Sequence, residues 1–311
     1  MKVVIPGGTG QVGALLARRL RARGDEVVIV ARGDGAEARW DGRTLGPWAE
    51  HLDGADVVVN LAGRSVNCRY TETNLREMMS SRVDSTRVVG EAIARARRPP
   101  RLWLQMSTAT IYAHRFDAPN EEATGLLGGD EPDAPAYWGL SVEIAKEWER
   151  TQAEAPTPPE VRKIALRTSM VMSPDRGGIF DVLLGMVRRG LGGPVAGGRQ
   201  YVSWIHDADF ARAIEFLIAR DDLAGAVNLA APAPLPHRDF MAALREAAGV
   251  RVALPAAKWM AEVGALFLRT NTELLLKSRR VVPGRLAAAG FAFDFPSWPE
   301  AARDLVRRWR T

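Results

Sequence analysis

The chain has 311 residues, of which 47% are hydrophobic and 25% charged, with a formal net charge of +5. These values are typical of a globular protein with one large domain or two closely joined ones. The single cysteine, Cys68, excludes an internal disulfide framework and favours a reducing compartment. Arginines are scattered among 37 acidic residues, so no basic stripe predicts nucleic-acid binding. With neither a signal-like segment nor an apolar run of membrane-spanning length, we expect a cytoplasmic protein without membrane contact.

A glycine-rich turn follows the first predicted strand. The β-branched residues 3–5 predict the strand, Gly7, Gly10 and Gly13 follow, and residues 14–23 predict a helix. Unpaired amides in the first turn of a helix, together with the helix dipole, favour a bound anion. Strand, glycine turn and helix in this order predict a pyrophosphate site, although glycines at this spacing also occur in ordinary turns.

Strands and helices then alternate through the first half of the chain. The expected strands are 26–31, 56–61, 101–106 and 163–167, and the expected helices are 45–52, 73–97 and 137–152. The first of these strands completes a βαβ unit with the glycine turn. The alternation predicts an α/β fold of the Rossmann type, with a doubly wound parallel sheet and helices on both faces.

The second half of the chain is richer in glycine. It contains expected helices at 179–189, 208–219, 238–248, 258–268 and 301–309, and a short expected strand at 227–229. We expect a dinucleotide-binding domain at 1–174, to which 203–230 return. A smaller, partly interleaved α/β domain at 175–202 and 231–311 is expected over the carboxyl ends of the strands, where open α/β sheets bind ligands. Residues 177–198 are an expected lid.

Eight motifs together resemble the extended branch of the short-chain dehydrogenase/reductase superfamily. The similarity is greatest to its atypical epimerase-like group, which is related to sugar-nucleotide epimerases. The motifs are GGTGQVG (7–13), NLAG (60–63), SRVDSTR (81–87), MSTATIY (106–112), LRTSMVMSP (166–174), GLGGP (190–194), SWIHDAD (203–209) and SRRVVPGRLAAAGFAF (278–293). Two departures fall in the first loop, with Pro6 in place of the usual Thr and Gln11 in place of an aromatic.

The end of the second strand favours NADP(H) over NAD(H). An acidic residue there would hydrogen-bond the ribose 2′-hydroxyl and repel a 2′-phosphate. This chain has Ala31 and Arg32 at that point, and the first carboxylate is Asp34. A guanidinium pairs well with phosphate, so Arg32 predicts NADP(H). The alternative for Arg32 is an exposed cation at a strand end.

The resemblance implies the full set of cofactor contacts. These are Gly7, Thr9, Gly10, Gln11, Val12, Gly13, Ala31, Arg32, Leu61, Ala62, Gly63, Glu77, Arg82, Ser107, Thr168, Ser169 and Met170. The stretch 61–63 resembles the family's wall beside the adenosine half, and 168–170 fall where the superfamily's chain passes the nicotinamide. For Glu77 and Arg82 the alternative is a charge pair on the helix surface, although a spacing of five residues is poor for direct contact.

The superfamily normally uses a Ser or Thr together with a Tyr and a Lys four residues apart on one helix. Thr108 matches the Ser/Thr position, with backbone capping as the alternative role. The Tyr/Lys pair does not match, because Val142 lies four residues before Lys146. Tyr137 precedes Lys146 by nine residues, which separates them by about 180° around a helix and about 13 Å along it. Tyr137 and Ser141 share a face instead.

Other acid/base candidates lie on loops at strand ends. Tyr112 and His114 follow the strand that ends near 106; the alternatives are a packing role for Tyr112 and a surface position for His114. Imidazole titrates near neutrality, which favours His114. Cys68 and Tyr70 follow the strand that ends near 61, and His206 resembles a family position that orients the next helix. No His, Cys or carboxylate cluster has metal-ligand spacing.

Two functions fit these observations. One is an NADP(H)-dependent oxidoreductase or epimerase that acts on a small polar substrate and uses an unconventional proton donor. The other is a catalytically degenerate NADP(H)-binding protein that works as a sensor or scaffold. The intact glycine turn supports both, and the missing Tyr/Lys pair motivates the second. The sequence does not identify the small-molecule substrate. It is compatible with a homodimer.

Overall fold

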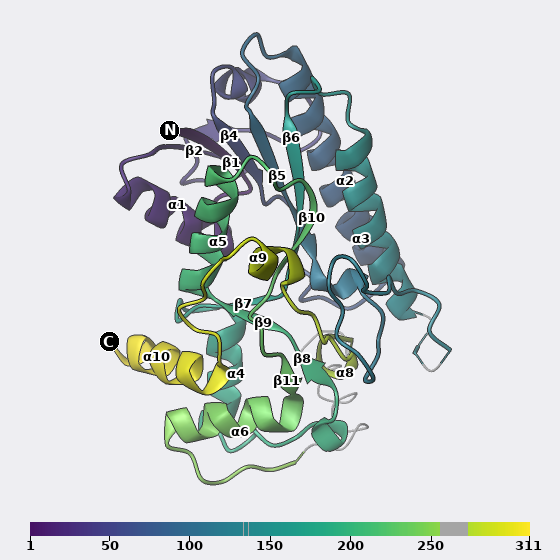
Figure 1. Ribbon diagram of the computed structural model, residues 1–311, viewed down its shortest axis with the longest axis vertical. Coiled ribbons are helices and arrows are strands. Elements are labelled where there is room, and N and C mark those ends of the chain that lie inside the picture. The colour runs from purple at the N-terminus through teal and green to yellow at the C-terminus, as the bar shows by residue number, and fades with distance from the viewer. Residues whose placement is uncertain (133, 136, 256–272) are drawn as a thin grey trace.

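The computed structural model describes residues 1–132, 134–135, 137–255 and 273–311. The helix expected at 258–268 lies outside these residues. A seven-stranded sheet fills the upper part of the molecule in Figure 1, and a group of helices and short strands lies below it.

The sheet is parallel throughout, in the order β10-β6-β5-β4-β1-β2-β3. Its strands are β1 (Lys2–Pro6), β2 (Glu26–Ala31), β3 (Ala38–Arg39), β4 (Val57–Asn60), β5 (Leu102–Thr108), β6 (Arg162–Thr168) and β10 (Gly225–Leu229). The predicted Rossmann fold is confirmed. The strand order reverses between β1 and β4, and the crevice outside their carboxyl ends is where such sheets bind ligands.

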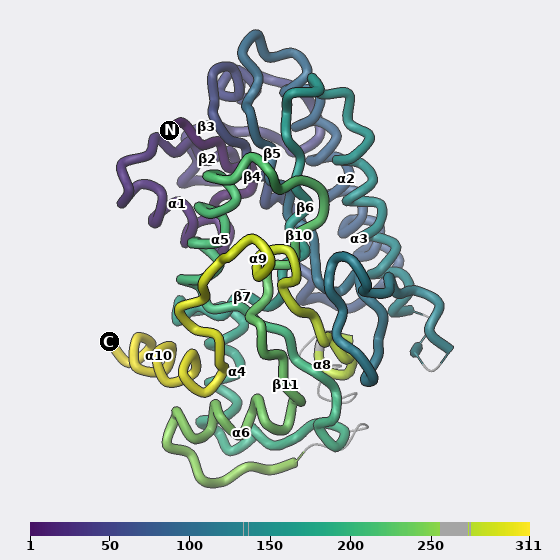
Figure 2. The backbone as a smooth tube through the Cα atoms, viewed as in Figure 1, coloured from purple at the N-terminus to yellow at the C-terminus, as the bar shows by residue number. Residues whose placement is uncertain are grey.

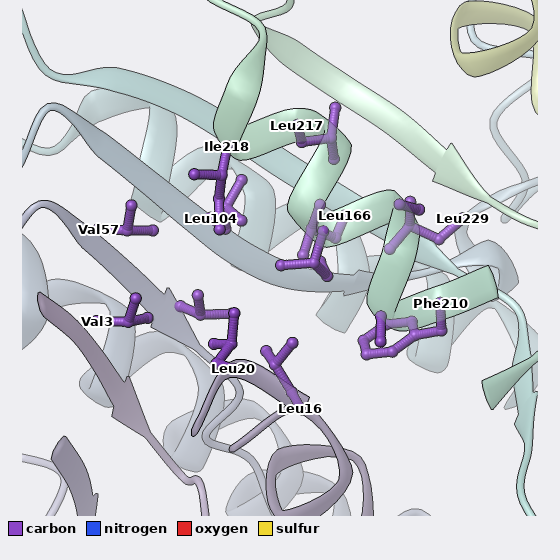
Figure 3. Packing of buried hydrophobic residues seen from close by; sticks show 14 of the residues in the cluster. Val3, Leu16, Leu20, Val57, Leu104, Leu166, Phe210, Leu217, Ile218 and Leu229 are labelled. Atoms are coloured by element: carbon purple, nitrogen blue, oxygen red, sulfur yellow. The ribbon is translucent and has the colours of Figure 1, made fainter. Parts of the chain in front are cut away.

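Helices cover both faces of the sheet. They are α1 (Gln11–Ala22) and α5 (Asp207–Ala219) on one face, and α2 (Glu72–Arg95) and α3 (Tyr137–Glu154) on the other. Alternate strand residues point to opposite faces, so Val3 and Val57 join the first core while Val4 and Val58 join the second. Figure 3 shows Leu16 of α1 and Phe210 of α5 packed within the first core.

A further core lies below the sheet. It is built from α4 (Ile179–Arg188), α6 (His237–Ala248), α10 (Trp298–Arg310) and four short strands, β7 (Met170–Met172), β8 (Tyr201–Val202), β9 (Trp204–His206) and β11 (Leu235–Pro236). Phe180 and Leu184 of α4 are buried in it. Within the segment expected to be a lid, the helix α4 is therefore packed into this core.

The C-terminal segment returns to the sheet after α8 (Glu273–Leu276). α9 (Gly284–Ala288) contacts β10, and Leu286 and Phe291 join the first core. In Figure 2 this segment passes from α8 to α9 beside the blue loop that follows β5. Among the described residues, three short 3-10 helices complete the elements: η1 (Pro47–Leu52), η2 (Ala109–Ile111) and η3 (Ala196–Gly198). The division at residue 174 into two folding units stays a prediction.

Candidate functional site

The glycine turn after β1 touches the end of β4. Gly7 has φ 79°, and its amide donates to Val30 O at 2.8 Å. A Cβ at Gly7 would lie 2.6 Å from Ala62 N, and the Leu61 amide donates to Pro6 O at 2.8 Å. Only glycine satisfies both this φ and this approach. The predicted wall at 61–63 therefore lies directly beside the turn.

The N-terminus of α1 fits a bound pyrophosphate. Gly10 is its N-cap, no described side chain caps it, and no acidic residue occurs in its first turn. Its amides are therefore left for an anion. A Cβ at Gly13 would lie 2.6 Å from Gly8 Cα, so at this position α1 packs directly against the turn. Thr9 is exposed, and Val12 packs against the first core.

The end of β2 carries the residues expected to choose the cofactor. Ala31 is buried and Arg32 is exposed beyond it. Asp34, the first carboxylate, pairs with Arg39 at 2.6 Å. Gln11 lies on the other side of the turn, where its Nε2 donates to Asp175 O at 3.4 Å. Gln11 thereby links α1 to the loop after β7.

Glu77 and Arg82 of α2 both contact Arg64 rather than each other. Glu77 pairs with the Arg64 guanidinium, and Arg82 Nη2 donates to Arg64 O at 3.0 Å. Arg82 is buried with its guanidinium over the Trp148 ring, and burial lowers the pKa of Arg82 to about 10. A Cβ at Gly63 would lie 3.4 Å from Arg82 Cγ, so this buried cation adjoins the predicted cofactor wall.

Ser107 and Tyr112 belong to one buried polar network. Ser107 Oγ donates to Glu149 at 2.6 Å, and Arg167 holds the same carboxylate with two hydrogen bonds of 2.8 and 2.9 Å. Arg167 also donates to the Tyr112 hydroxyl at 3.0 Å, which donates to Asn228 Oδ1 at 2.9 Å. Burial raises the pKa of Tyr112. The network links β6 to β10. Tyr112 therefore has the packing role that was its alternative to proton donation.

Hydroxyl groups lie at and after the carboxyl ends of β5 and β6. Thr108 Oγ1 accepts from the Thr110 amide at 3.1 Å, which caps η2 and leaves its proton for another acceptor. Thr168 Oγ1 donates to Leu166 O. Ser169 Oγ is buried, and no hydrogen-bond partner for it occurs among the described residues. An orphaned hydroxyl at 168–170, where Met170 begins β7, fits a bound polar group such as the cofactor's carboxamide end.

His114 holds the C-terminal segment. Its Nδ1 accepts from the Ser278 amide at 2.7 Å, and its ring packs edge-on against Phe116 and Trp138. This hydrogen bond anchors the loop after β5 to the C-terminal segment. Tyr137 begins α3 with its ring 6.4 Å from that of Trp138.

The C-terminal segment also delivers a buried charged cluster that the sequence did not predict. Ser141, one turn after Tyr137, donates to Glu273 Oε1 at 2.6 Å. Lys277 Nζ lies 3.5 Å from the same oxygen and donates to Thr110 O at 3.0 Å, while Arg279 Nε donates to Thr110 Oγ1 at 3.2 Å. Burial lowers the pKa of Lys277 to about 8. No local sequence pattern predicts this cluster, because Lys277 and Thr110 are 167 residues apart.

The other loop candidates have different surroundings. Tyr70 is partly buried, and burial together with the nearby Glu273 carboxylate raises its pKa. Cys68 Sγ lies 3.8 Å from Met78 Sδ. His206 is fully buried; its Nδ1 accepts from the Ala208 amide, so it caps α5. Over the described ranges no group of metal-ligating side chains forms, and no helix is long and apolar enough to span a membrane.

Comparison with known proteins places this geometry in a family. Residues 3–230 match the NAD dependent epimerase/dehydratase family, and residues 257–305 match a domain of unknown function, DUF1731. The human epimerase family protein SDR39U1 is 31% identical over 98% of this chain and 100% of its own length. An epimerase family protein of Mycobacterium tuberculosis is 31% identical over 96% of this chain and 95% of its own.

A solved structure agrees over the whole chain. The crystal structure of human SDR39U1 with NADPH superposes with a TM-score of 0.85, at 28% identity and over 99% of both chains. The predicted resemblance to the extended epimerase-like reductases is confirmed. This chain belongs to the NAD dependent epimerase/dehydratase family.

Proposed function

We propose that the protein is an NADP(H)-dependent oxidoreductase or epimerase acting on a small polar substrate. The observation that carries this proposal is the uncapped N-terminus of α1 at the switch point of the sheet, with Gly10 leaving room for phosphates. The human relative, whose structure includes NADPH, supports it. A cytoplasmic location, favoured by the single cysteine, is part of the proposal and is checked by cell fractionation.

The chain's own residues divide the binding. Amides of α1 and its turn hold the pyrophosphate, and the wall at 61–63 borders the adenosine half. Arg32 pairs with a ribose 2′-phosphate, which favours NADP(H) over NAD(H). Thr108, whose hydroxyl proton is left for an acceptor, and the orphaned Ser169 hydroxyl are the polar groups assigned to the nicotinamide end. A bound reduced nicotinamide supplies hydride.

Arg32→Asp tests the cofactor. A charge-assisted phosphate contact contributes about 1.5–3 kcal/mol, so the wild type binds NADPH about 10- to 100-fold more tightly than NADH. We expect Arg32→Asp to abolish or reverse this preference in fluorescence titrations. Arg95→Asp, an exposed arginine near the end of α2, is the matched control and keeps it. Equal affinities of the wild type for the two cofactors would refute the NADP(H) assignment.

The sensor or scaffold function remains the second candidate, because the Tyr-Lys spacing is absent. Val142 is buried four residues before Lys146, and Ser141 stands four residues after Tyr137. Both functions require NADPH binding, and only turnover separates them. We expect NADPH oxidation with at least one member of a panel of carbonyl compounds and sugar nucleotides. Tight binding without any oxidation across the panel would favour the scaffold.

A further inference from the structure

The C-terminal segment passes between the loop that follows β5 and Ser203, the residue that joins β8 to β9. The Ser278 amide donates to His114, the Asn120 amide donates to Arg280 O at 2.6 Å, and Ser203 Oγ donates to Arg279 O at 2.7 Å. These bonds hold residues 277–281 between two parts of the chain that lie far apart in sequence (Figure 2). The position of Lys277 is therefore set by the backbone contacts of the three residues that follow it.

Lys277 is a buried ammonium with unused hydrogen-bonding capacity. Its side chain is only 1% exposed. Among the described residues it has two partners, Thr110 O and the Glu273 carboxylate. An ammonium has three N–H groups, so one remains for a further acceptor. The Lys277 ammonium lies against the turn that carries the Thr108 hydroxyl, and Thr108 is two residues before Thr110.

The surroundings of Lys277 suit a group that gives and takes a proton. The charged groups that face it are Glu273 and Glu131, which favour its ammonium form, and Arg279, which opposes it. Burial is the largest influence and lowers the pKa of Lys277 to about 8. Enzymes bring lysines into this range by burial so that the amine can act as a general acid or base near neutral pH.

Three other candidates for this task, Tyr112, His114 and Tyr70, are held by other groups or poorly matched. The Tyr112 hydroxyl is held between Arg167 and Asn228, and His114 Nδ1 accepts from the backbone. Burial and Glu273 raise the pKa of Tyr70, which makes its phenol a weaker acid. Ser141, four residues after Tyr137, donates to Glu273 and so adjoins the Lys277 ammonium through that carboxylate.

We propose that Lys277, carried into the site by the C-terminal segment, is the general acid/base that replaces the missing tyrosine–lysine pair. The inference rests on the proposed oxidoreductase function. In the reducing direction the substrate's carbonyl carbon accepts hydride, and Lys277 Nζ gives a proton to the carbonyl oxygen. The C=O π pair forms the new O–H bond, the N–H pair stays on nitrogen, and the neutral amine regains its proton from solvent. Glu273 positions the amine.

Lysine NMR tests the proposal without a known substrate. The chain has five lysines, at positions 2, 146, 163, 258 and 277, so selective ¹³Cε-lysine labelling gives few signals and Lys277→Met assigns one of them. We expect that signal to titrate near pH 8. Added NADP⁺, whose oxidised nicotinamide is cationic, should lower its midpoint by about one unit. A midpoint above pH 10, or one that saturating NADP⁺ leaves unchanged, would overturn the proposal.

Turnover distinguishes a proton donor from a buried structural charge. Lys277→Met is expected to lower NADPH-dependent turnover by about 10²- to 10⁴-fold. Lys277→Arg keeps the charge but cannot lose its proton, so it should be equally impaired. Lys163→Met is the matched control, because Lys163 also donates to backbone carbonyls and is partly buried, but at the start of β6.

Different results would contradict the role of Lys277 and the proposed oxidoreductase function. Wild-type protein that binds no NADPH contradicts the proposed function. Wild-type turnover that survives in Lys277→Arg contradicts only the role of Lys277. NADPH affinity and melting temperature of each variant are measured in parallel, so loss of turnover with both unchanged supports the proposal.

Discussion

Gly13→Ala is the sharpest test of the glycine turn. The added Cβ would lie 2.6 Å from Gly8 Cα and 2.7 Å from Gly8 C and O, all of them backbone atoms. Ordinary contact begins near 3.4 Å, so α1 and the turn separate by about 0.8 Å. Overpacking of this kind costs about 1–3 kcal/mol of stability. The same shift lengthens the amide contacts to phosphate, each of which contributes about 1.5–3 kcal/mol, so NADPH affinity falls about 10- to 100-fold.

Two other glycines supply the controls. A Cβ at Gly46 would lie 3.5 Å from the Trp48 ring, an ordinary contact, so Gly46→Ala changes stability by less than about 0.5 kcal/mol and leaves binding intact. A Cβ at Gly10 meets only Gly7 O at 3.5 Å, so Gly10→Ala keeps stability but loses NADPH affinity. Urea unfolding followed by tryptophan fluorescence and NADPH titration measure both quantities. Wild-type stability and affinity in Gly13→Ala would refute the close packing.

The remaining predictions concern buried charge. Arg167→Met leaves the Glu149 carboxylate, whose side chain is 15% exposed, without its guanidinium and should cost about 3–5 kcal/mol in urea unfolding; a loss below 1 kcal/mol would contradict the network. Burial lowers the pKa of His237 to about 4, so its protonation favours the unfolded chain. Stability is full above about pH 6.5 and falls by about 3 kcal/mol toward pH 4. His237→Asn should remove this part of the acid sensitivity, and parallel pH profiles would contradict it.

The sheet was predictable because its signals are local. A buried parallel strand is a short run of apolar residues, as in Val57–Asn60, and the glycine turn adds a fixed spacing. The two-residue strand Ala38–Arg39 and the short pair of β7 with β9 were missed. Two or three residues are too few to show a periodic pattern, and such short strands are held in place by contacts with residues distant in sequence.

The candidate site was predictable only where it depends on local sequence. The spacing in the glycine turn and the position of Arg32 were readable because each occurs within one βαβ unit. His114 was predicted as an acid/base candidate because imidazole titrates near neutrality, yet its Nδ1 accepts a hydrogen bond from the Ser278 amide. Lys277 could not be found, because the contact with Thr110 spans 167 residues and depends on how the C-terminal segment is threaded.

The charged cluster bears on the choice between enzyme and scaffold. A protein that only binds a dinucleotide needs the cradle at α1, which lies at the switch point between β1 and β4. It has no need of Lys277, Arg279 and Glu273 buried together beside the Thr108–Thr110 turn. Burying such charges is unfavourable, and apolar residues of similar volume often give equal or greater stability. Because stability alone does not account for an ammonium at this place, the cluster favours an enzyme over a scaffold.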